Sequence, residues 1–160
     1  MSPDDHRPAV PDLYETDFYL WTQAQAEAIR AHGQAAPTAN PPIDWDRVAE
    51  EIEDMGKSER REARSRTIVI LQHLFKLAWS KRPEPRGGWE ETIVTQRDDL
   101  KSTLTPTIRK SVEIELESLH LVAADAASRA FAADEPSAPR DVSLRWTLPQ
   151  ILGEENDPIA

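Results

Sequence analysis

The sequence contains no cysteine, and only 5 of its 160 residues are glycine. The missing thiols exclude disulfides, thiolate nucleophiles and cysteine-based zinc sites. The few glycines form no G-x-G-x-x-G or G-x-x-x-x-G-K-[ST] loop, and no G-x-S-x-G is present. Phosphate-binding loops and the nucleophile elbow of hydrolases are therefore not indicated.

Long apolar runs are also missing. No segment approaches the ~20 residues that a membrane-spanning helix needs, and the first residues lack the basic and apolar regions of a secretory signal. The hydrophobic fraction is 39% and the mean hydropathy is -0.61, yet five tryptophans are available as core anchors. We therefore expect a soluble, cytoplasmic chain with the length of one domain.

The net charge of -10 is distributed unevenly. Residues 1–55 carry 12 acids and 3 bases, residues 56–110 carry 7 acids and 13 bases, and residues 111–160 carry 10 acids and 3 bases. The overall acidity disfavours binding of nucleic acid by the chain as a whole. The basic middle either neutralises the acidic flanks across helix contacts or faces an anionic partner.

Apolar residues recur with helical spacing, and no segment has a convincing period of two. Residues 1–11 are rich in proline and aspartate and are predicted to form a disordered tail. We expect residues 12–157 to form a single all-α domain, a helical bundle of about five principal helices plus a short C-terminal helical turn. The expected helices are 13–32, 44–55, 58–81, 90–104 and 107–132, and the short turn falls in WTLPQIL at 146–152.

Local signals set these boundaries. Asp12 and Asp44 are expected N-caps, and Pro106 suits the start of the last long helix. Gly33 is expected to end the first helix. Gly56 is expected to break or kink the chain between the second and third helices, rather than to lie inside one long helix.

Five segments resemble the bacterial domain-of-unknown-function family numbered twenty-nine. They are YETDFYLWTQAQA, DWDRVAEEIEDMGKSERREARSR, HLFKLAW, GGWEETIVTQR and WTLPQIL, and together they extend over about residues 13–157. The departures are a proline-rich linker, QAAPTANPP, and Ala78 within LFKLAW. The resemblance implies a compact all-helical domain and implies no activity.

A helical wheel of the expected third helix, drawn at 100° per residue, centres its apolar face near Leu74 and Thr67. Arg60 and Arg64 fall on the same side. Since an unpaired buried charge costs several kcal/mol, two interpretations remain. This end of the helix is exposed and its arginines pair with the acids at 50–54, or the guanidinium groups line a pocket that binds an anion.

His73 and Arg66 border the same apolar arc, Lys76 lies one turn from His73, and Glu51 occupies the matching border of the preceding helix. His73 is either a satisfied structural residue or a general acid/base with cationic neighbours. The candidate polar cluster consists of Glu51, Arg60, Arg64, Arg66, His73 and Lys76.

The loop KLAWSKRPEPRGGW interleaves basic and aromatic residues, as surfaces that bind single-stranded nucleic acid do. Bases at a helix C-terminus also complement the helix dipole. The candidate anion-binding residues of this loop are Lys81, Arg82, Arg86 and Trp89. Gln96 lies on the apolar stripe of the next helix, so its amide is expected to need a buried partner.

Metal chemistry has little support. Glu117 and His120 form an E-x-x-H, but di-iron bundles need a second copy and further inward Glu residues. His32, His73 and His120 come from three expected helices, and nothing in their spacing demands a site. We predict no metal and no cofactor.

Three functions remain, and whether the chain is an enzyme is left open. The favoured hypothesis is a non-enzymatic interaction module, because no catalytic signature is complete and charge is segregated along the chain. The first alternative is an enzyme or an anion- or phosphate-binding protein that uses the candidate polar cluster. The second is nucleic-acid binding through the loop at 76–89. Among partners, an unknown protein and a homo-oligomer stay open, nucleic acid is disfavoured, and no membrane is expected.

Overall fold

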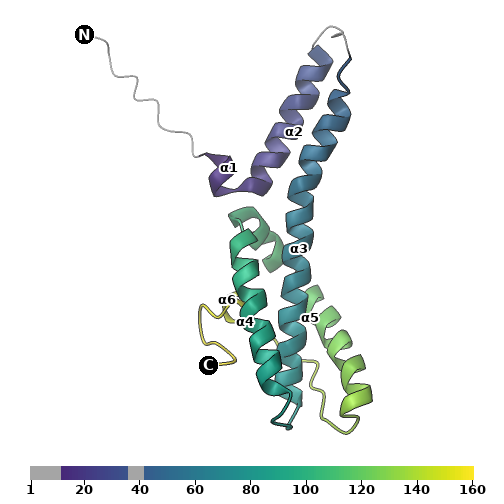
Figure 1. Cartoon of the computed structure of the whole chain (residues 1–160), viewed down its shortest axis with the longest axis vertical. Coiled ribbons are helices and arrows are strands. Elements are labelled where there is room, and N and C mark those ends of the chain that lie inside the picture. Colours follow the sequence, from purple (N-terminus) through teal and green to yellow (C-terminus); the bar gives the residue numbers. More distant parts are fainter. Residues whose placement is uncertain (1–11, 36–41) are drawn as a thin grey trace, which may run out of the picture. The chain divides into compact units, whose positions relative to one another are not determined.

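The structure, a computed structural model, describes residues 12–35 and 42–160, so the predicted tail at 1–11 lies outside the described residues. Figure 1 shows the helices in sequence colours. They are α1 (Leu13–Thr16), α2 (Phe18–Ala35), α3 (Trp45–Trp79), α4 (Arg86–Thr103), α5 (Pro106–Asp134) and α6 (Leu148–Leu152). No strand occurs in the described ranges, which confirms the all-α prediction.

The chain divides into two compact units, residues 1–56 and residues 57–160. The helix α3 belongs to both of them. The single domain expected over 12–157 stays a prediction.

The expected break at Gly56 is wrong, because α3 is one helix of 35 residues. Gly56 is buried, and a Cβ atom at this position would clash with the side-chain oxygen of Thr22 and lie 3.3 Å from the ring of Tyr19. The glycine therefore allows α2 to approach α3 closely, which outweighs its helix-propensity cost of about 1 kcal/mol.

The single helix expected at 13–32 is also wrong, because it is interrupted at Asp17. Asp17 ends α1, and its carboxylate accepts a hydrogen bond from the backbone N–H of Leu20 in the first turn of α2. Asp12 caps α1 as predicted, with its carboxylate accepting from the Tyr14 N–H. Gly33 does not end α2, which continues to Ala35.

The first unit packs α2 against the N-terminal part of α3 with small side chains. Thr22, Ala26 and Ala49 are fully buried. Arg30 of α2 and Glu53 of α3 form an ion pair of 2.8 Å. Asp44 caps α3, as predicted, by accepting from the Arg47 N–H. The two helices are thus held by close approach and by polar contacts at the edge.

The second unit contains the rest of α3, with α4 and α5 on either side of it (Figure 1) and α6 near the C-terminus. The predicted apolar centre of the third helix is confirmed, since Ile70, Leu71 and Leu74 are buried. The largest fully buried side chains of this unit are Ile70, Leu71, Leu74, Phe75, Ile93, Leu100, Ile108, Leu119, Leu148, Ile151, Leu152 and His120.

The buried face of α5 shifts around the helix along its length. Ile108, Val112, Leu119 and Ala123 are buried on one row. His120, Ala124, Ala127 and Phe131 are buried on the adjacent row, toward the C-terminal half of α5.

The short C-terminal helix is confirmed. Thr147 caps α6 in a reciprocal box with Gln150, and Pro149 lies in the first turn. Gly153 ends α6 with φ 68°, a left-handed conformation that glycine adopts without strain.

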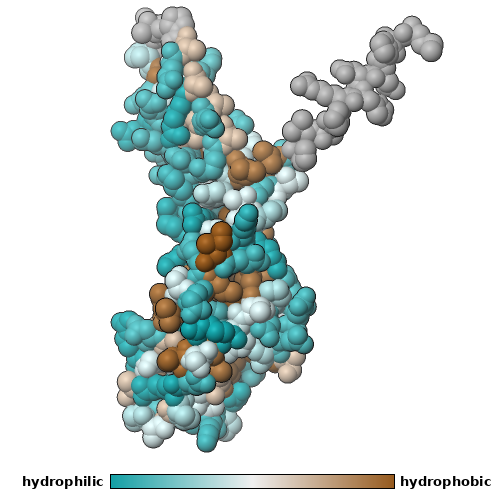
Figure 2. All heavy atoms as spheres, turned by 180° about the vertical axis from the view of Figure 1, so that it is seen from behind, coloured by the Kyte–Doolittle hydropathy of each residue, from teal (hydrophilic) through white to brown (hydrophobic). Residues whose placement is uncertain are grey.

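The face shown in Figure 2 is mainly hydrophilic, with brown apolar patches separated by teal hydrophilic surface. None of the helices in the described residues is both long enough and apolar enough to cross a membrane.

Candidate functional site

Two arginines of the candidate polar cluster converge on one carboxylate. Arg60 Nη2 lies 2.6 Å from Glu115 Oε1, and Arg64 Nε lies 3.2 Å from Glu115 Oε2. The hydrogen bond from Arg60 holds the pKa of Glu115 below its ordinary value. The sequence pointed to the acids at 50–54 as partners and missed Glu115, which α5 places beside α3. About half of each arginine side chain remains exposed, at 46%.

Arg66 belongs to a separate ion-pair group. Its guanidinium lies 2.6 Å from Glu62 and 2.7 Å from Asp99 of α4, and it also donates to Gln96 Oε1 at 3.2 Å. Gln96 thus has the partner that the sequence called for, although the site is only half-buried. This group joins α3 to α4.

The remaining members of the candidate polar cluster, His73, Lys76 and Glu51, contact different partners. His73 is half-buried and bonds the Val69 carbonyl through Nδ1 at 2.8 Å. Burial lowers the pKa of His73, and nearby Lys76 lowers it further. Lys76 Nζ lies 5.9 Å from the ring centroid of Trp89. Glu51 is exposed and belongs to the first unit.

The candidate anion-binding loop is partly used by the fold. Arg86 Nη1 donates to the carbonyls of Leu77 and Ser80 at 2.9 and 3.2 Å, so it caps the C-terminus of α3. Trp89 receives Lys76 on its face. The side chains of Lys81 and Arg82 are exposed and make no hydrogen bond or ion pair within the described part of the chain. These two cations are available to a ligand.

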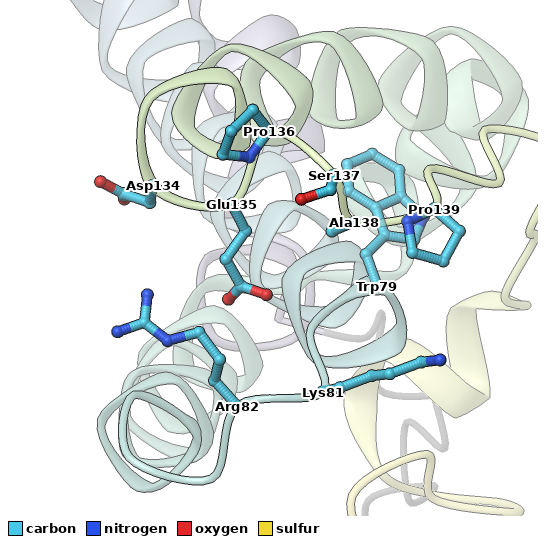
Figure 3. A pocket seen from close by; sticks show the side chains of 9 residues that line it. All are labelled: Trp79, Lys81, Arg82, Asp134, Glu135, Pro136, Ser137, Ala138 and Pro139. Carbon is cyan, nitrogen blue, oxygen red and sulfur yellow. The ribbon is translucent and has the colours of Figure 1, made fainter.

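Lys81 and Arg82 lie at the rim of a surface pocket of about 490 Å3, which we call the α3–α5 groove (Figure 3). It lies between the end of α3 and the segment that follows α5. Its lining consists of Trp79, Lys81, Arg82, Asp134, Glu135, Pro136, Ser137, Ala138 and Pro139. A second pocket of about 340 Å3 shares Arg82, Asp134 and Glu135 with the first, and Lys76 and Trp89 contribute to its lining.

Hydrogen bonds fix the shape of this groove. Glu135 extends toward the end of α3 between Arg82 and Trp79 (Figure 3), and its carboxylate accepts from the Ser80 hydroxyl at 2.6 Å. The indole N–H of Trp79 donates to the Asp141 carbonyl at 3.1 Å. Arg140 donates to the Pro136 carbonyl at 3.2 Å and to Ser128. The groove is therefore largely preformed.

The two sides of the groove carry opposite charges. Lys81 and Arg82 follow α3, whereas Asp134 and Glu135 stand at the end of α5. Carboxylates at a helix C-terminus are unfavourable with respect to the helix dipole, and nearby cations offset that cost. The sequence missed the acidic side because it lies more than 50 residues away in the chain. A purely anionic ligand therefore meets attraction on one side and repulsion on the other.

Sequence reasoning also missed the main buried charge, Arg97, whose residue is 5% exposed. Its guanidinium donates to the Ile151 carbonyl at 2.7 Å and to the Gln150 carbonyl at 3.1 Å, and it lies 2.9 Å from Asp157 Oδ1. Arg97 thus caps α6 and fixes the C-terminal segment. Helical spacing placed the neighbouring Gln96, and not Arg97, on the inward face of α4.

His120 is the second buried polar residue that the sequence misplaced. The sequence offered it only as part of an E-x-x-H pair, and it is 1% exposed. Nε2 accepts from the Trp146 backbone N–H at 3.0 Å, so Nδ1 carries the proton and donates to the Leu116 carbonyl at 2.8 Å. Burial lowers the pKa of His120. The neutral imidazole therefore serves the fold.

The described residues contain no group of three or more His, Cys, Asp or Glu side chains placed to hold a metal ion. Both nitrogens of His120 are occupied as given above, and Glu117 pairs with Arg145 at 2.7 Å. His32 contacts Trp45 with ring centroids 5.0 Å apart. The E-x-x-H pair thus takes part in contacts that hold the segment at 145–146.

Comparisons with known proteins agree with the all-helical fold. A crystal structure of an alpha-helical protein of unknown function from Rhodospirillum rubrum ATCC 11170 matches with a TM-score of 0.78 and 27% identity, over 91% of this chain and 92% of that one. No curated protein matches. The model of the family described as domain of unknown function DUF29 matches residues 13–156. The chain therefore belongs to the DUF29 family.

Proposed function

We propose that this chain is a non-enzymatic interaction module, and that the α3–α5 groove binds an extended segment of a partner protein that carries side chains of both charges. The observation that supports this most directly is the pair of opposed sides, Lys81 and Arg82 against Asp134 and Glu135. Ion pairs with both sides would attract such a segment and fix its position along the groove.

The chemistry of the groove favours binding over catalysis. Its lining includes no imidazole, and the Ser80 hydroxyl beside it is already bonded to Glu135. A nucleophile or a general base needs a partner within hydrogen-bond reach that is free to exchange a proton. The buried polar groups Arg97 and His120 are engaged within the fold.

A selection experiment tests the proposal. A display library of random decapeptides is selected on the immobilised chain, and the enriched peptides are measured by isothermal titration calorimetry. We expect peptides that combine acidic and basic residues. Arg82→Glu reverses one charge of the groove and should weaken binding about 10-fold or more, whereas Arg129→Ala, on the exposed side of α5, should not change it. Higher salt should weaken binding by the parent chain.

The proposal fails if no peptide is enriched, or if the enriched peptides bind the Arg82→Glu variant as tightly as the parent. A single-stranded oligonucleotide at ~50 mM salt serves as a further ligand. Tight binding of that oligonucleotide, lost in the Arg82→Glu variant, would replace the peptide proposal with the nucleic-acid alternative.

A second candidate function is anion binding at the first turns of α3 in the second unit. Lys57, Arg60, Arg61 and Arg64 line a pocket of about 270 Å3. Arg60 and Arg64 donate to Glu115, whereas Arg61 is exposed. Guanidinium groups suit phosphate, so we expect pyrophosphate to bind and Arg61→Ala to weaken it several-fold in calorimetry. Equal binding by the variant would contradict this site.

A further inference from the structure

The outward face of α5 carries large apolar side chains where a surface helix is normally polar. Ile114 is 76% exposed, Leu121 is 55% exposed and Val122 is 44% exposed. Ile114 and Leu121 are seven residues apart, which is two helical turns, so they lie on the same side of the helix. Val122 adjoins Leu121. Together we call these three residues the α5 outer stripe.

Opposite charges stand at the two ends of this stripe. Lys110 lies one turn before Ile114, and Asp125 lies one turn after Leu121. Both side chains are exposed, and Asp125 also pairs with Arg129 of its own helix. The sequence of features along the helix is therefore cation, apolar, apolar, anion. A helix with this order is complementary to an antiparallel copy of itself, because each cation then meets an anion and the apolar residues meet one another.

We propose that two copies of this chain associate through the α5 outer stripe, with their α5 helices antiparallel and a two-fold axis near Ser118. Ile114 of one copy then packs against Leu121 and Val122 of the other. Lys110 of one copy lies opposite Asp125 of the other, and the same pairs repeat on the far side of the axis. This surface is separate from the α3–α5 groove and does not depend on its function.

The residues near the axis suit a close helix crossing. Ser118 has a small side chain, and its hydroxyl donates to the Glu115 carbonyl of its own helix at 2.7 Å, so it requires no partner across the axis. Glu117, the acid nearest the axis, is paired with Arg145 at 2.7 Å. The intramolecular ion pair reduces the repulsion that two facing carboxylates would produce.

The size of the stripe sets the strength of the contact. Two helical turns with three apolar side chains per copy form an interface below the ~1,200 Å2 of stable complexes. We therefore expect a reversible dimer with a dissociation constant of about 10 µM to 1 mM, and not an obligate one.

Sedimentation velocity over ~5 µM to ~1 mM chain gives the first test. The parent chain should shift from monomer to dimer, and Leu121→Asp should remain monomeric. Val94→Asp is the matched control, because Val94 is 49% exposed on α4, outside the stripe, and this variant should dimerise like the parent. A parent chain that stays monomeric, or a dimer that survives Leu121→Asp, overturns the proposal.

Charge exchange tests the antiparallel register. Lys110→Glu alone should weaken the dimer several-fold, and Lys110→Glu combined with Asp125→Lys should restore it. Circular dichroism confirms that each variant remains helical. Failure of the double variant to recover association contradicts the proposed pairing.

The absence of cysteine allows a direct test of the two-fold axis. Ser118→Cys brings two thiols together at the axis, so mild oxidation should give a disulfide-linked dimer in high yield. Thr95→Cys introduces an exposed thiol on α4 and should give little disulfide-linked dimer. Equal cross-linking of the two variants, or none in either, overturns the proposal.

Discussion

The two units of this chain are held together in different ways. In the described residues of the first unit, the fully buried side chains are small, namely Thr22, Ala26 and Ala49, and Leu20 and Met55 are exposed. In the second unit, Ile70, Leu71 and Phe75 are fully buried. Buried apolar area stabilises in proportion to its size. The first unit therefore depends on close helix approach, and the second depends on a core of large side chains.

The comparison is tested most strongly by removing one large core side chain. Phe75 is fully buried, and its ring lies 5.2 Å from that of Trp79 and 5.0 Å from that of Trp146. Phe75→Ala should lower the free energy of unfolding by about 3–5 kcal/mol. Leu20→Ala, at a side chain that is 43% exposed, should cost less than about 0.5 kcal/mol. Urea denaturation followed by circular dichroism measures both, and equal losses would contradict the contrast.

The buried arginine gives the next largest effect. Arg97→Met leaves Asp157 and two carbonyls of α6 without their partner, which should cost about 3 kcal/mol. Arg109→Met removes the more exposed pair with Glu154 and should cost no more than about 1 kcal/mol. Amide hydrogen exchange at 148–152 should accelerate in the first variant only. Similar protection in both variants would show that Arg97 does not hold α6.

The close approach of α2 to α3 in the first unit is tested at Gly56. Gly56→Ala should destabilise by about 1–3 kcal/mol, because its methyl group meets the Thr22 side chain. Gly88→Ala, where an added Cβ meets nothing within 4 Å, should be neutral or stabilise α4 by up to about 1 kcal/mol. Hydrogen exchange of the α2 amides reports the difference.

Adding Thr22→Ala to the Gly56→Ala variant should recover part of the loss, because it removes the oxygen that the methyl group meets. If Gly56→Ala stabilises α3 instead, helix propensity outweighs packing in the first unit.

The smallest expected effect is a pH dependence confined to the second unit. Burial lowers the pKa of His120 and of His73, so the folded state binds fewer protons than the unfolded state. Stability should be full above the ordinary histidine pKa of about 6.5 and should fall as the pH drops below it. Urea midpoints between pH 7 and 5 measure this slope.

The variant His120→Gln should be less stable at pH 7. Its urea midpoint should also fall less steeply between pH 7 and 5, because one of the two histidines with a lowered pKa is gone. An unchanged slope would assign the pH dependence to other groups.

Helix caps could be predicted from the sequence, and contacts between distant segments could not. Caps at Asp12 and Asp44 were predicted, because each depends on residues within four positions. Gly56 was misinterpreted, because the same glycine that ends a helix also permits close packing inside one, and only the position of Thr22 distinguishes the two cases.

The candidate sites show the same limit. The sequence identified Arg60 and Arg64 as arginines that need partners, but Glu115 lies about 50 residues away. It named Lys81 and Arg82 as candidate anion-binding residues, but could not place Glu135 beside them. Helical periodicity gives the face of a residue on its own helix and says nothing about which helix meets that face.

Two independent features restrict which residue can occupy position 153, namely its backbone conformation and the ion pair beside it. Its φ of 68° alone would admit asparagine, the usual substitute in that conformation. A Cβ atom there would also lie 3.0 Å from Arg97 Nη1 and 3.2 Å from Asp157 Oδ2. Asparagine would fit this backbone conformation, but its Cβ atom would press on the ion pair of Arg97 and Asp157. Glycine is therefore the residue that fits position 153 while this ion pair is present.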